Sequence, residues 1–234
     1  GPVWDAAMFI VPMALYDYYG DKQSINRIYH TCERYLAYLA TREDTDGCVT
    51  YGIGDWVPYK TQTPTDYTTS CYYYLDNLYM SKFSEILGYD GSVYKAKAKK
   101  LKGLINNKYF DARKNTYANG SQTSLAIALY LGIVPEGMEQ KVADNLYQAV
   151  KGNNGYLDFG VLGSKTVLRM LSKYGYADMA YQMASKEDEP SWGAWIKKGF
   201  NTMPETWTLS PEFRDASINH MFLGDINAWM YNVL

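Results

Sequence analysis

The sequence is poor in the residues that build metal sites and disulfide frameworks. Its 234 residues include only two histidines, His30 and His220, which lie far apart in the chain. The three cysteines Cys32, Cys48 and Cys71 are odd in number and form no C-x-x-C pair, so they suggest neither a disulfide framework nor a zinc site. We therefore expect no metal and no cofactor, because a metal centre needs clustered ligands.

Other absences narrow the range of partners and folds. Charge is nearly balanced, with 23 Lys and Arg against 25 Asp and Glu, and no basic run points to nucleic acid. No apolar run reaches the length that crosses a bilayer, so we expect no membrane partner. Alternation of apolar and polar residues, which is typical of strands, is also missing, and this favours an all-α chain.

Aromatic residues are abundant, and several stand beside acids. The chain has 24 tyrosines and 6 tryptophans, and acids neighbour tryptophans at Trp4-Asp5, Asp55-Trp56 and Glu205-Thr206-Trp207. An indole offers a flat apolar face, and a carboxylate offers hydrogen bonds and proton transfer, which together suit a polyhydroxylated ligand. For a single pair, a core tryptophan beside a surface acid is an equally good interpretation.

The order of apolar and amphipathic segments predicts repeated helix hairpins. Buried-looking helices alternate with amphipathic ones, and short turns alternate with long loops. Short turns join antiparallel neighbours, so every long loop should leave the assembly at the same end. The expected helices are a first one opened by Trp4-Asp5 with Asp5 as N-cap, then 22–42, 66–87, 93–109, 122–131, one ending near 151, 164–174, 176–185 and a final helix over 216–234.

The pattern describes an (α/α)6 toroid with its long loops around the mouth of a central cavity. We interpret residues 186–215 as one long excursion at the loop end and place His220 in the first turn of the last helix. Four hairpins and one inner helix fall short of six hairpins, so we expect one domain over residues 1–234 that is incomplete at both ends. The groups that then converge on one end are Trp4-Asp5, Asp55-Trp56, Trp192, Glu205-Trp207 and His220, which favours a functional cavity over scattered core residues.

As an ordered set, the segments of this chain resemble the catalytic domain of bacterial α-L-rhamnosidases of glycoside hydrolase family 78. The resemblance runs nearly from end to end. Its segments are V-W-D-A-A, P-M-A-L-Y-D-Y-Y-G-D, G-D-W, T-S-C-Y-Y-Y-L, G-S-Q-T-S-L-A-I-A-L-Y-L-G-I-V-P, F-G-V-L-G-S-K, P-S-W-G-A-W-I, G-F-N-T-M-P-E-T-W and S-I-N-H-M-F-L-G. It implies an (α/α)6 barrel and an inverting glycosidase without a cofactor, acting on a rhamnose-containing carbohydrate.

The resemblance also implies roles for individual residues. Inversion needs an acid for the leaving oxygen and a base for the attacking water, and Glu205 matches the family's base. The sugar-contacting positions that match are the tryptophans Trp4, Trp56, Trp192 and Trp207, the acids Asp55 and Asp5, and the histidine His220.

The chain departs from the family pattern in two places. The usual G-A-T-T before the base is G-F-N-T here, with Pro204 directly before Glu205. The family's general acid belongs to a motif that should precede residue 1, and Asp5 or Asp55 is a poor substitute. We therefore expect residues 1–234 to be inactive alone and to need other domains of the same chain. Another (α/α)6 glycosidase, acting on glucosides or uronides, and a non-catalytic sugar-binding relative remain as alternatives.

Overall fold

The computed structural model describes residues 1–209 and 216–233, and nearly all of its regular structure is helical. The chain divides into two compact units. The first unit holds residues 1–54 and 65–109, and the second holds residues 55–64 and the chain from Phe110 onward. Each unit is described by itself below.

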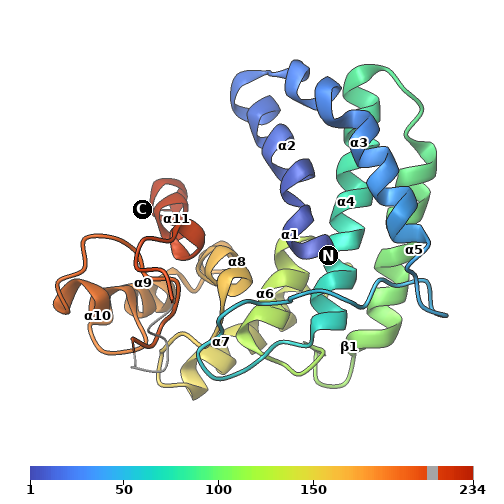
Figure 1. Cartoon of the computed structure of the whole chain (residues 1–234). Helices are drawn as coiled ribbons and strands as arrows, with labels where there is room; N and C mark the ends of the chain where they lie inside the picture. The colour runs from blue at the N-terminus through green and yellow to red at the C-terminus, as the bar shows by residue number, and fades with distance from the viewer. Residues whose placement is uncertain (210–215, 234) are drawn as a thin grey trace. The chain divides into compact units, whose positions relative to one another are not determined.

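The first unit consists of two helix hairpins preceded by one helical turn (Figure 1). The hairpins are α2 with α3 and α4 with α5, as the sequence pattern predicts. Gly20, with a φ of 67°, ends α2, and the Asp21 side chain caps α3 by accepting hydrogen bonds from the next amides. The bounds are α1 (Pro2–Asp5), α2 (Ala7–Tyr19), α3 (Lys22–Ala40), α4 (Thr65–Leu87) and α5 (Ser92–Tyr109).

Helix α4 is the core of this unit, and the amphipathic α3 packs one face against it. The face of α3 that is buried is the one expected from its 3.6-residue period, since it holds Ile25, Tyr29, Cys32, Leu36 and Leu39. Along α4 every residue from Tyr67 to Asn77 is buried. The buried-inside and amphipathic-outside arrangement is therefore present in this unit.

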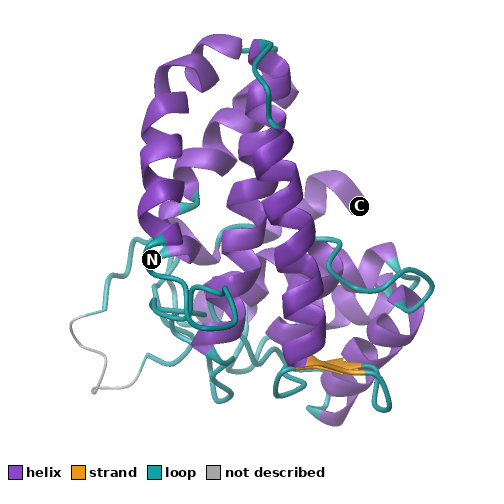
Figure 2. Cartoon of the chain, turned by 90° about the vertical axis from the view of Figure 1, so that its right-hand side faces the viewer, coloured by secondary structure: helices purple, strands orange, loops and turns teal. Residues whose placement is uncertain are grey.

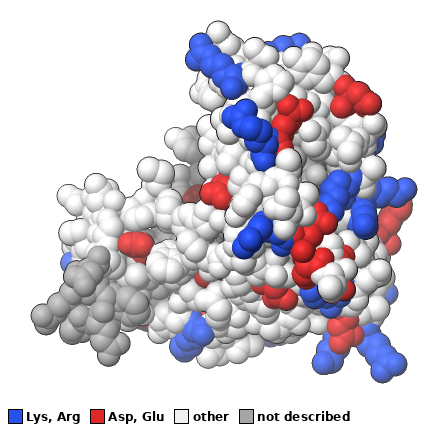
Figure 3. Space-filling view, turned by 45° about the vertical axis from the view of Figure 1, so that its right-hand side comes forward, with Lys and Arg blue, Asp and Glu red and all other residues white. Residues whose placement is uncertain are grey.

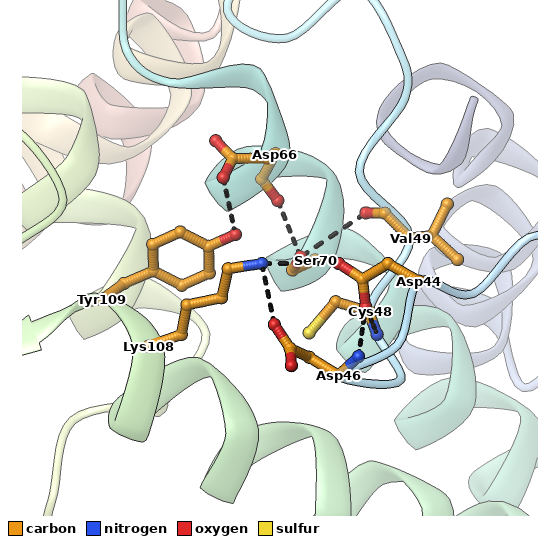
Figure 4. A network of polar contacts seen from close by, with 8 residues as sticks. All are labelled: Asp44, Asp46, Cys48, Val49, Asp66, Ser70, Lys108 and Tyr109. Atoms are coloured by element: carbon orange, nitrogen blue, oxygen red, sulfur yellow. Dashed lines mark hydrogen bonds and ion pairs between the residues drawn. The ribbon is translucent and has the colours of Figure 1, made fainter.

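Polar contacts hold the first long loop against α4 and α5 (Figure 4). The ammonium of Lys108 lies 3.4 Å from carboxylate oxygens of both Asp44 and Asp46. Beside it, the hydroxyl of Tyr109 donates a hydrogen bond of 2.9 Å to Asp66. The contacts of Lys108 anchor the start of the loop to α5, and the bond between Tyr109 and Asp66 joins α5 to α4.

The second unit adds two more hairpins, α6 with α7 and α8 with α9. A short antiparallel ribbon, in which Phe110 pairs with Tyr117, precedes α6 (orange in Figure 2). Helices α6 and α8 carry the buried side chains, and α7 is amphipathic. The bounds are β1 (Phe110–Asp111), β2 (Thr116–Tyr117), α6 (Gln122–Tyr130), α7 (Glu139–Gly152), α8 (Val161–Lys173), α9 (Ala177–Ala184), α10 (Trp192–Lys197), the 3₁₀ helix η2 (Met221–Leu223) and α11 (Ile226–Val233).

The long loops of this unit gather at one end, as the hairpin pattern predicts. The amides of Lys60 and Thr61 donate hydrogen bonds of 2.8 and 2.9 Å to the carboxylate of Asp158. The side-chain amide of Asn119 donates to the carbonyl of Gln62 at 3.0 Å. The loops after α3, α5 and α7 therefore meet.

The prediction of a helix over residues 216–234 with His220 in its first turn is wrong. His220 lies in extended backbone before η2, and α11 begins only at Ile226. The reason is that backbone groups of residues 217–220 form hydrogen bonds with residues 203–205 and not with one another. The carbonyl of Ser217 accepts from the amide of Glu205, and the amide of His220 donates to the carbonyl of Met203. Within the expected excursion, residues 210–215 lie outside the described part of the chain.

Two further boundaries differ from expectation. Asp5 is the last residue of α1 and does not cap α2, which begins after Ala6 without a side-chain cap. Helix α8 starts three residues early, at Val161, because its first amides find acceptors in residues 55–56.

Charge is not separated by sign on the one face of the molecule drawn in Figure 3. Acidic and basic side chains are interspersed on the face drawn in Figure 3. None of the helices described is long and apolar enough to cross a membrane. Over residues 1–209 and 216–233, no group of three or more His, Cys, Asp and Glu side chains could hold a metal ion.

Candidate functional site

The carboxylate of Glu205 is held by two donors from distant parts of the second unit. The indole Nε1 of Trp56 donates to Oε1 at 3.0 Å, and the amide of Ser217 donates to Oε2 at 3.2 Å. These bonds lower the pKa of Glu205, chiefly through Trp56 and then Ser217, and the charge of His220 acts in the same direction. Glu205 is therefore an ionised, oriented and half-buried carboxylate at neutral pH.

The backbone around Glu205 is fixed by a neck, which we define as residues 202–205 and 217–220. The amide of Glu205 donates to the carbonyl of Ser217 at 2.8 Å, and the amide of His220 donates to the carbonyl of Met203 at 2.8 Å. The hydroxyl of Thr202 donates to the carbonyl of Ile218 at 2.5 Å. The neck brings Glu205 and His220 into one structure by backbone pairing.

Trp56 combines a fixed backbone with an exposed side chain. Its carbonyl accepts a hydrogen bond of 3.0 Å from the amide of Val161, the first residue of α8. The approach is close enough that a Cβ on Gly160 would lie 2.0 Å from this carbonyl oxygen, so only glycine fits there. The indole itself is 42% exposed. Trp56 can therefore bond Glu205 and still present surface to a ligand.

Asp55 is buried at the start of α8. Its carboxylate accepts from the hydroxyl of Thr123 at 2.7 Å, the amide of Gly160 at 3.0 Å and the amide of Leu162 at 2.8 Å. Burial raises the pKa of Asp55, and these hydrogen bonds oppose the rise. Only 1% of the residue is exposed, so the geometry is that of a carboxylate that caps a helix from a neighbouring loop.

Trp192 and Trp207 belong to a buried aromatic cluster. Trp207 stacks on Trp195 with ring centroids 4.9 Å apart and meets Trp192 edge to face at 5.0 Å. The indole of Trp207 donates to the carbonyl of Phe159 at 2.6 Å, and that of Trp192 donates to the carbonyl of Leu223 at 3.0 Å. Both rings are nearly inaccessible to solvent. Glu205 lies two residues before Trp207, so this buried cluster holds the backbone next to Glu205 in place.

His220 is half-buried at the start of η2. Its Nδ1 accepts a hydrogen bond of 3.4 Å from the amide of Phe222, and its ring lies edge to face on Phe222 with centroids 3.9 Å apart. These contacts orient the imidazole and use Nδ1 as the acceptor. The remaining nitrogen, Nε2, is the atom that such an orientation offers to a ligand.

A small hollow adjoins this group. It has a volume of about 80 Å³ and is lined by Val57, Pro58, Tyr59, Thr206, Trp207 and Thr208. Three of the lining residues directly follow Trp56 in the chain, and the other three directly follow Glu205. The hydrogen bond between Trp56 and Glu205 joins these two segments. Two aromatic residues, Tyr59 and Trp207, and two threonines give this hollow a lining that is partly apolar and partly polar.

Trp4 and Asp5 belong to the first unit. Trp4 is half-buried, and the carboxylate of Asp5 accepts a hydrogen bond of 2.9 Å from the hydroxyl of Tyr35. Burial first, and then this bond, raises the pKa of Tyr35. A shared site of these two residues with Glu205 stays a prediction.

The structure thus brings together Trp56, Glu205 and His220, and it places Asp55, Trp192 and Trp207 behind them. Three contributors escaped the sequence analysis, namely Ser217, Thr123 and Gly160. Ser217 and Thr123 act through one amide and one hydroxyl, which leave no signal in a sequence. Gly160 could have been noticed as a glycine directly before a helix start.

The chain matches known proteins over its whole length. A family model described as the bacterial alpha-L-rhamnosidase six-hairpin glycosidase domain matches residues 1–234. An alpha-L-rhamnosidase of Streptomyces avermitilis is 28% identical over 236 residues, which are 97% of this chain and 23% of the relative. One of Formosa agariphila is 28% identical over 249 residues, which are 99% of this chain and 26% of the relative.

Solved structures agree with these matches. The S. avermitilis enzyme complexed with L-rhamnose superposes with a TM-score of 0.91 at 27% identity, covering 97% of this chain and 22% of that one. The alpha-L-rhamnosidase from Dictyoglumus thermophilum has a TM-score of 0.91 at 30% identity, covering 99% of this chain and 27% of that one. The chain spans about a quarter of the length of these relatives. The expected fold class is confirmed, because the mostly helical chain matches part of a six-hairpin (α/α)6 glycosidase domain.

Proposed function

The chain belongs to the family of bacterial α-L-rhamnosidase six-hairpin glycosidase domains, and from this membership we propose that it supplies the general base for inverting hydrolysis of terminal α-L-rhamnosides. The observation that carries the proposal is the carboxylate of Glu205, ionised and oriented by Trp56 and Ser217. A base must be deprotonated before the water arrives, and the lowered pKa of Glu205 supports this role.

In the proposed reaction, a water attacks the anomeric carbon of rhamnose while Glu205 takes one of its protons. The bond between the anomeric carbon and the glycosidic oxygen breaks, and that oxygen receives a proton from a general acid on the opposite face. The first product is β-L-rhamnose together with the free aglycone. One proton enters the carboxylate of Glu205 and one leaves the acid, so the enzyme resets by exchange with solvent.

The general acid is proposed to come from outside residues 1–234. The resemblance to the family places the general acid in a motif that should precede residue 1, and this is the reason for the proposal. Asp55 is buried and committed to three donors, which makes it unsuited to giving a proton to a leaving oxygen.

We divide the candidate residues between direct contact and support. Trp56 and His220 are proposed to contact the sugar, since the first exposes its indole and the second has an oriented ring. Asp55, Trp192 and Trp207 are proposed to hold these groups in place, because all three are nearly closed to solvent.

The test is hydrolysis of p-nitrophenyl α-L-rhamnopyranoside by the full natural polypeptide, with the first anomer formed identified by NMR. Glu205→Gln should lower kcat by about 10²- to 10⁴-fold, whereas Glu136→Gln, an exposed acid of the same unit, should leave it unchanged. Release of α-L-rhamnose first, or unchanged activity in Glu205→Gln, would contradict the proposal. Activity of residues 1–234 alone would place the acid within them.

A further inference from the structure

Within residues 1–209 and 216–233, the ammonium of Lys165 on α8 has no carboxylate bonded to it. The residue is half-buried, and among the described residues its ammonium makes neither an ion pair nor a hydrogen bond. Arg169, one turn further along α8, takes the nearby carboxylate instead and donates to Asp225 with two nitrogens at 3.0 and 2.8 Å. One positive charge is therefore left unbalanced beside a satisfied Arg–Asp pair.

The environment of Lys165 favours a negative partner. Burial lowers the pKa of Lys165, Arg169 adds to the decrease, and Asp225 offsets it only in part. A partly dehydrated ammonium gains most from an anion, because hydrogen bonds between charged partners are about twice as strong as neutral ones.

Lys165 lines an open groove of about 420 Å³ in the second unit. Val161, Met221 and Phe222 supply apolar lining, and Asp225 and Asn227 add polar groups. This volume lies within the range of roughly 300–1,000 Å³ that small-molecule sites occupy. Apolar faces with a few polar groups suit a sugar ring, which has both a C–H face and hydroxyls.

Two separate links connect this groove to Glu205. Val161 lines the groove, and its amide donates to the carbonyl of Trp56, whose indole bonds Glu205. The second link is the segment 217–222, which begins in the neck. At its start the amide of Ser217 donates to Glu205, and at its end Phe222 lines the groove. Two residues that line the groove, Val161 and Phe222, therefore donate hydrogen bonds to Trp56 and His220, the two residues proposed to contact the sugar.

We propose that Lys165 binds an anionic group, a carboxylate or a sulfate ester, on the saccharide unit that carries the scissile rhamnose. This inference rests on the proposed function, and it adds a preference for acidic saccharides to it. A neutral saccharide would leave the ammonium unpaired, whereas an acidic one would neutralise it without disturbing Arg169 and Asp225.

The test compares the affinity of the natural polypeptide for three ligands by calorimetry. These are rhamnose linked to glucose, rhamnose linked to glucuronic acid, and rhamnose linked to a glucose sulfate. The acidic ligands should bind about tenfold more tightly than the neutral one at low salt, and the difference should shrink as salt rises. Whichever acidic ligand shows the larger preference identifies the anion.

Lys165→Met keeps the apolar stem and removes the charge, so it should abolish the preference while leaving the neutral ligand's affinity unchanged. Lys173→Met, at the other and exposed end of α8, is the matched control and should keep the preference. Equal affinity for neutral and acidic ligands, or a preference that survives Lys165→Met, would overturn the assignment.

Failure of the proposed function has a different signature. If the wild type binds the neutral rhamnoside but shows no preference for the acidic ligands, only the role of Lys165 is contradicted. Binding of glucuronic acid that depends on Lys165, without any affinity for rhamnosides, would keep the anion site and contradict the proposed function. Absence of all binding would contradict both.

Discussion

The indole nitrogen of Trp56 and the Oε1 atom of Glu205 lie 3.0 Å apart although 149 positions separate the two residues in sequence. The bond is the largest cause of the lowered pKa of Glu205. It therefore joins the proposed base to the tryptophan with the exposed indole, and it makes the ionisation of one residue depend on the position of the other.

Trp56→Phe should shift the acidic limb of the pH profile of kcat/KM to higher pH. The indole stabilises the ionised carboxylate, so the pKa of Glu205 rises when the donor is removed. A base works only when deprotonated, so activity should be lost at a higher pH than in the wild type. The measurement is the pH dependence of p-nitrophenyl rhamnoside hydrolysis. Trp229→Phe, which removes the hydrogen bond from an indole to Ser172 on α8, should leave the limb in place.

Gly160→Ala should lower both activity and stability. The added Cβ would meet the carbonyl oxygen of Trp56 at 2.0 Å, and this rigid backbone can relieve the clash only by moving. We expect about 1–3 kcal/mol of destabilisation and a fall in kcat as Trp56 leaves Glu205. Urea unfolding and kinetics measure the two effects. Gly152→Ala is the control, since a Cβ there meets nothing within 4 Å, and an unchanged Gly160→Ala would contradict the described contact.

Asp55→Asn should destabilise the second unit by about 1–3 kcal/mol. The carboxylate accepts from two amides and one hydroxyl, and an asparagine would turn an NH₂ group toward one of these donors. Urea unfolding followed by tryptophan fluorescence measures the loss. Asp178→Asn, an exposed acid on α9, should change stability by less than about 0.5 kcal/mol. An equal effect of the two substitutions would mean that the buried carboxylate is not needed.

Asp76→Asn should remove part of the pH dependence of stability. Asp76 in α4 is fully buried, and within residues 1–209 and 216–233 its oxygens have no hydrogen-bond partner. Burial, followed by the charge of Asp5, raises its pKa well above the ordinary value. Between the pKa of Asp76 in the unfolded chain and its higher pKa in the folded chain, only the folded chain keeps the proton. The contribution of Asp76 to the free energy of unfolding therefore falls as pH rises through this range.

The measurement for Asp76 is the free energy of unfolding from pH 4 to pH 7. The wild type should lose stability over this range relative to Asp76→Asn, whose side chain does not titrate. Asp17→Asn, on the neighbouring α2, should follow the wild type. Parallel curves for the wild type and Asp76→Asn would show that Asp76 is ionised in the folded state.

The helices were predictable because their signals are local. The 3.6-residue period of α3 identified its buried face, and Gly88, with a φ of 80°, ends α4 where a glycine was expected to do so. The last helix was predicted wrongly at its start. Its apolar pattern suggested a helix from residue 216, but residues 217–220 bond to residues 202–205 instead of to one another. A sequence pattern does not reveal a competing partner as distant as Thr202 is from Ile218, which are 16 positions apart.

Candidate site residues could be selected from the sequence, but their geometry could not be predicted from it. Glu205 could be chosen from its neighbours, whereas the contact with Trp56 depends on three loops meeting in space. Whether a residue is buried also depends on parts of the chain that are distant in sequence. The G-D-W motif suggested that Asp55 and Trp56 act alike, but the fold buries the first at the start of α8 and exposes the second.

The neck has a consequence for how this family of sites can diversify. Because backbone bonds join residues 202–205 to residues 217–220, the position of Glu205 is set below the segment that connects them. The same bonds hold the backbone of His220, so a change in one half of the neck would shift Glu205 and His220 together. The proposed base and the histidine proposed to contact the sugar therefore belong to one backbone unit, and neither can be repositioned independently of the other.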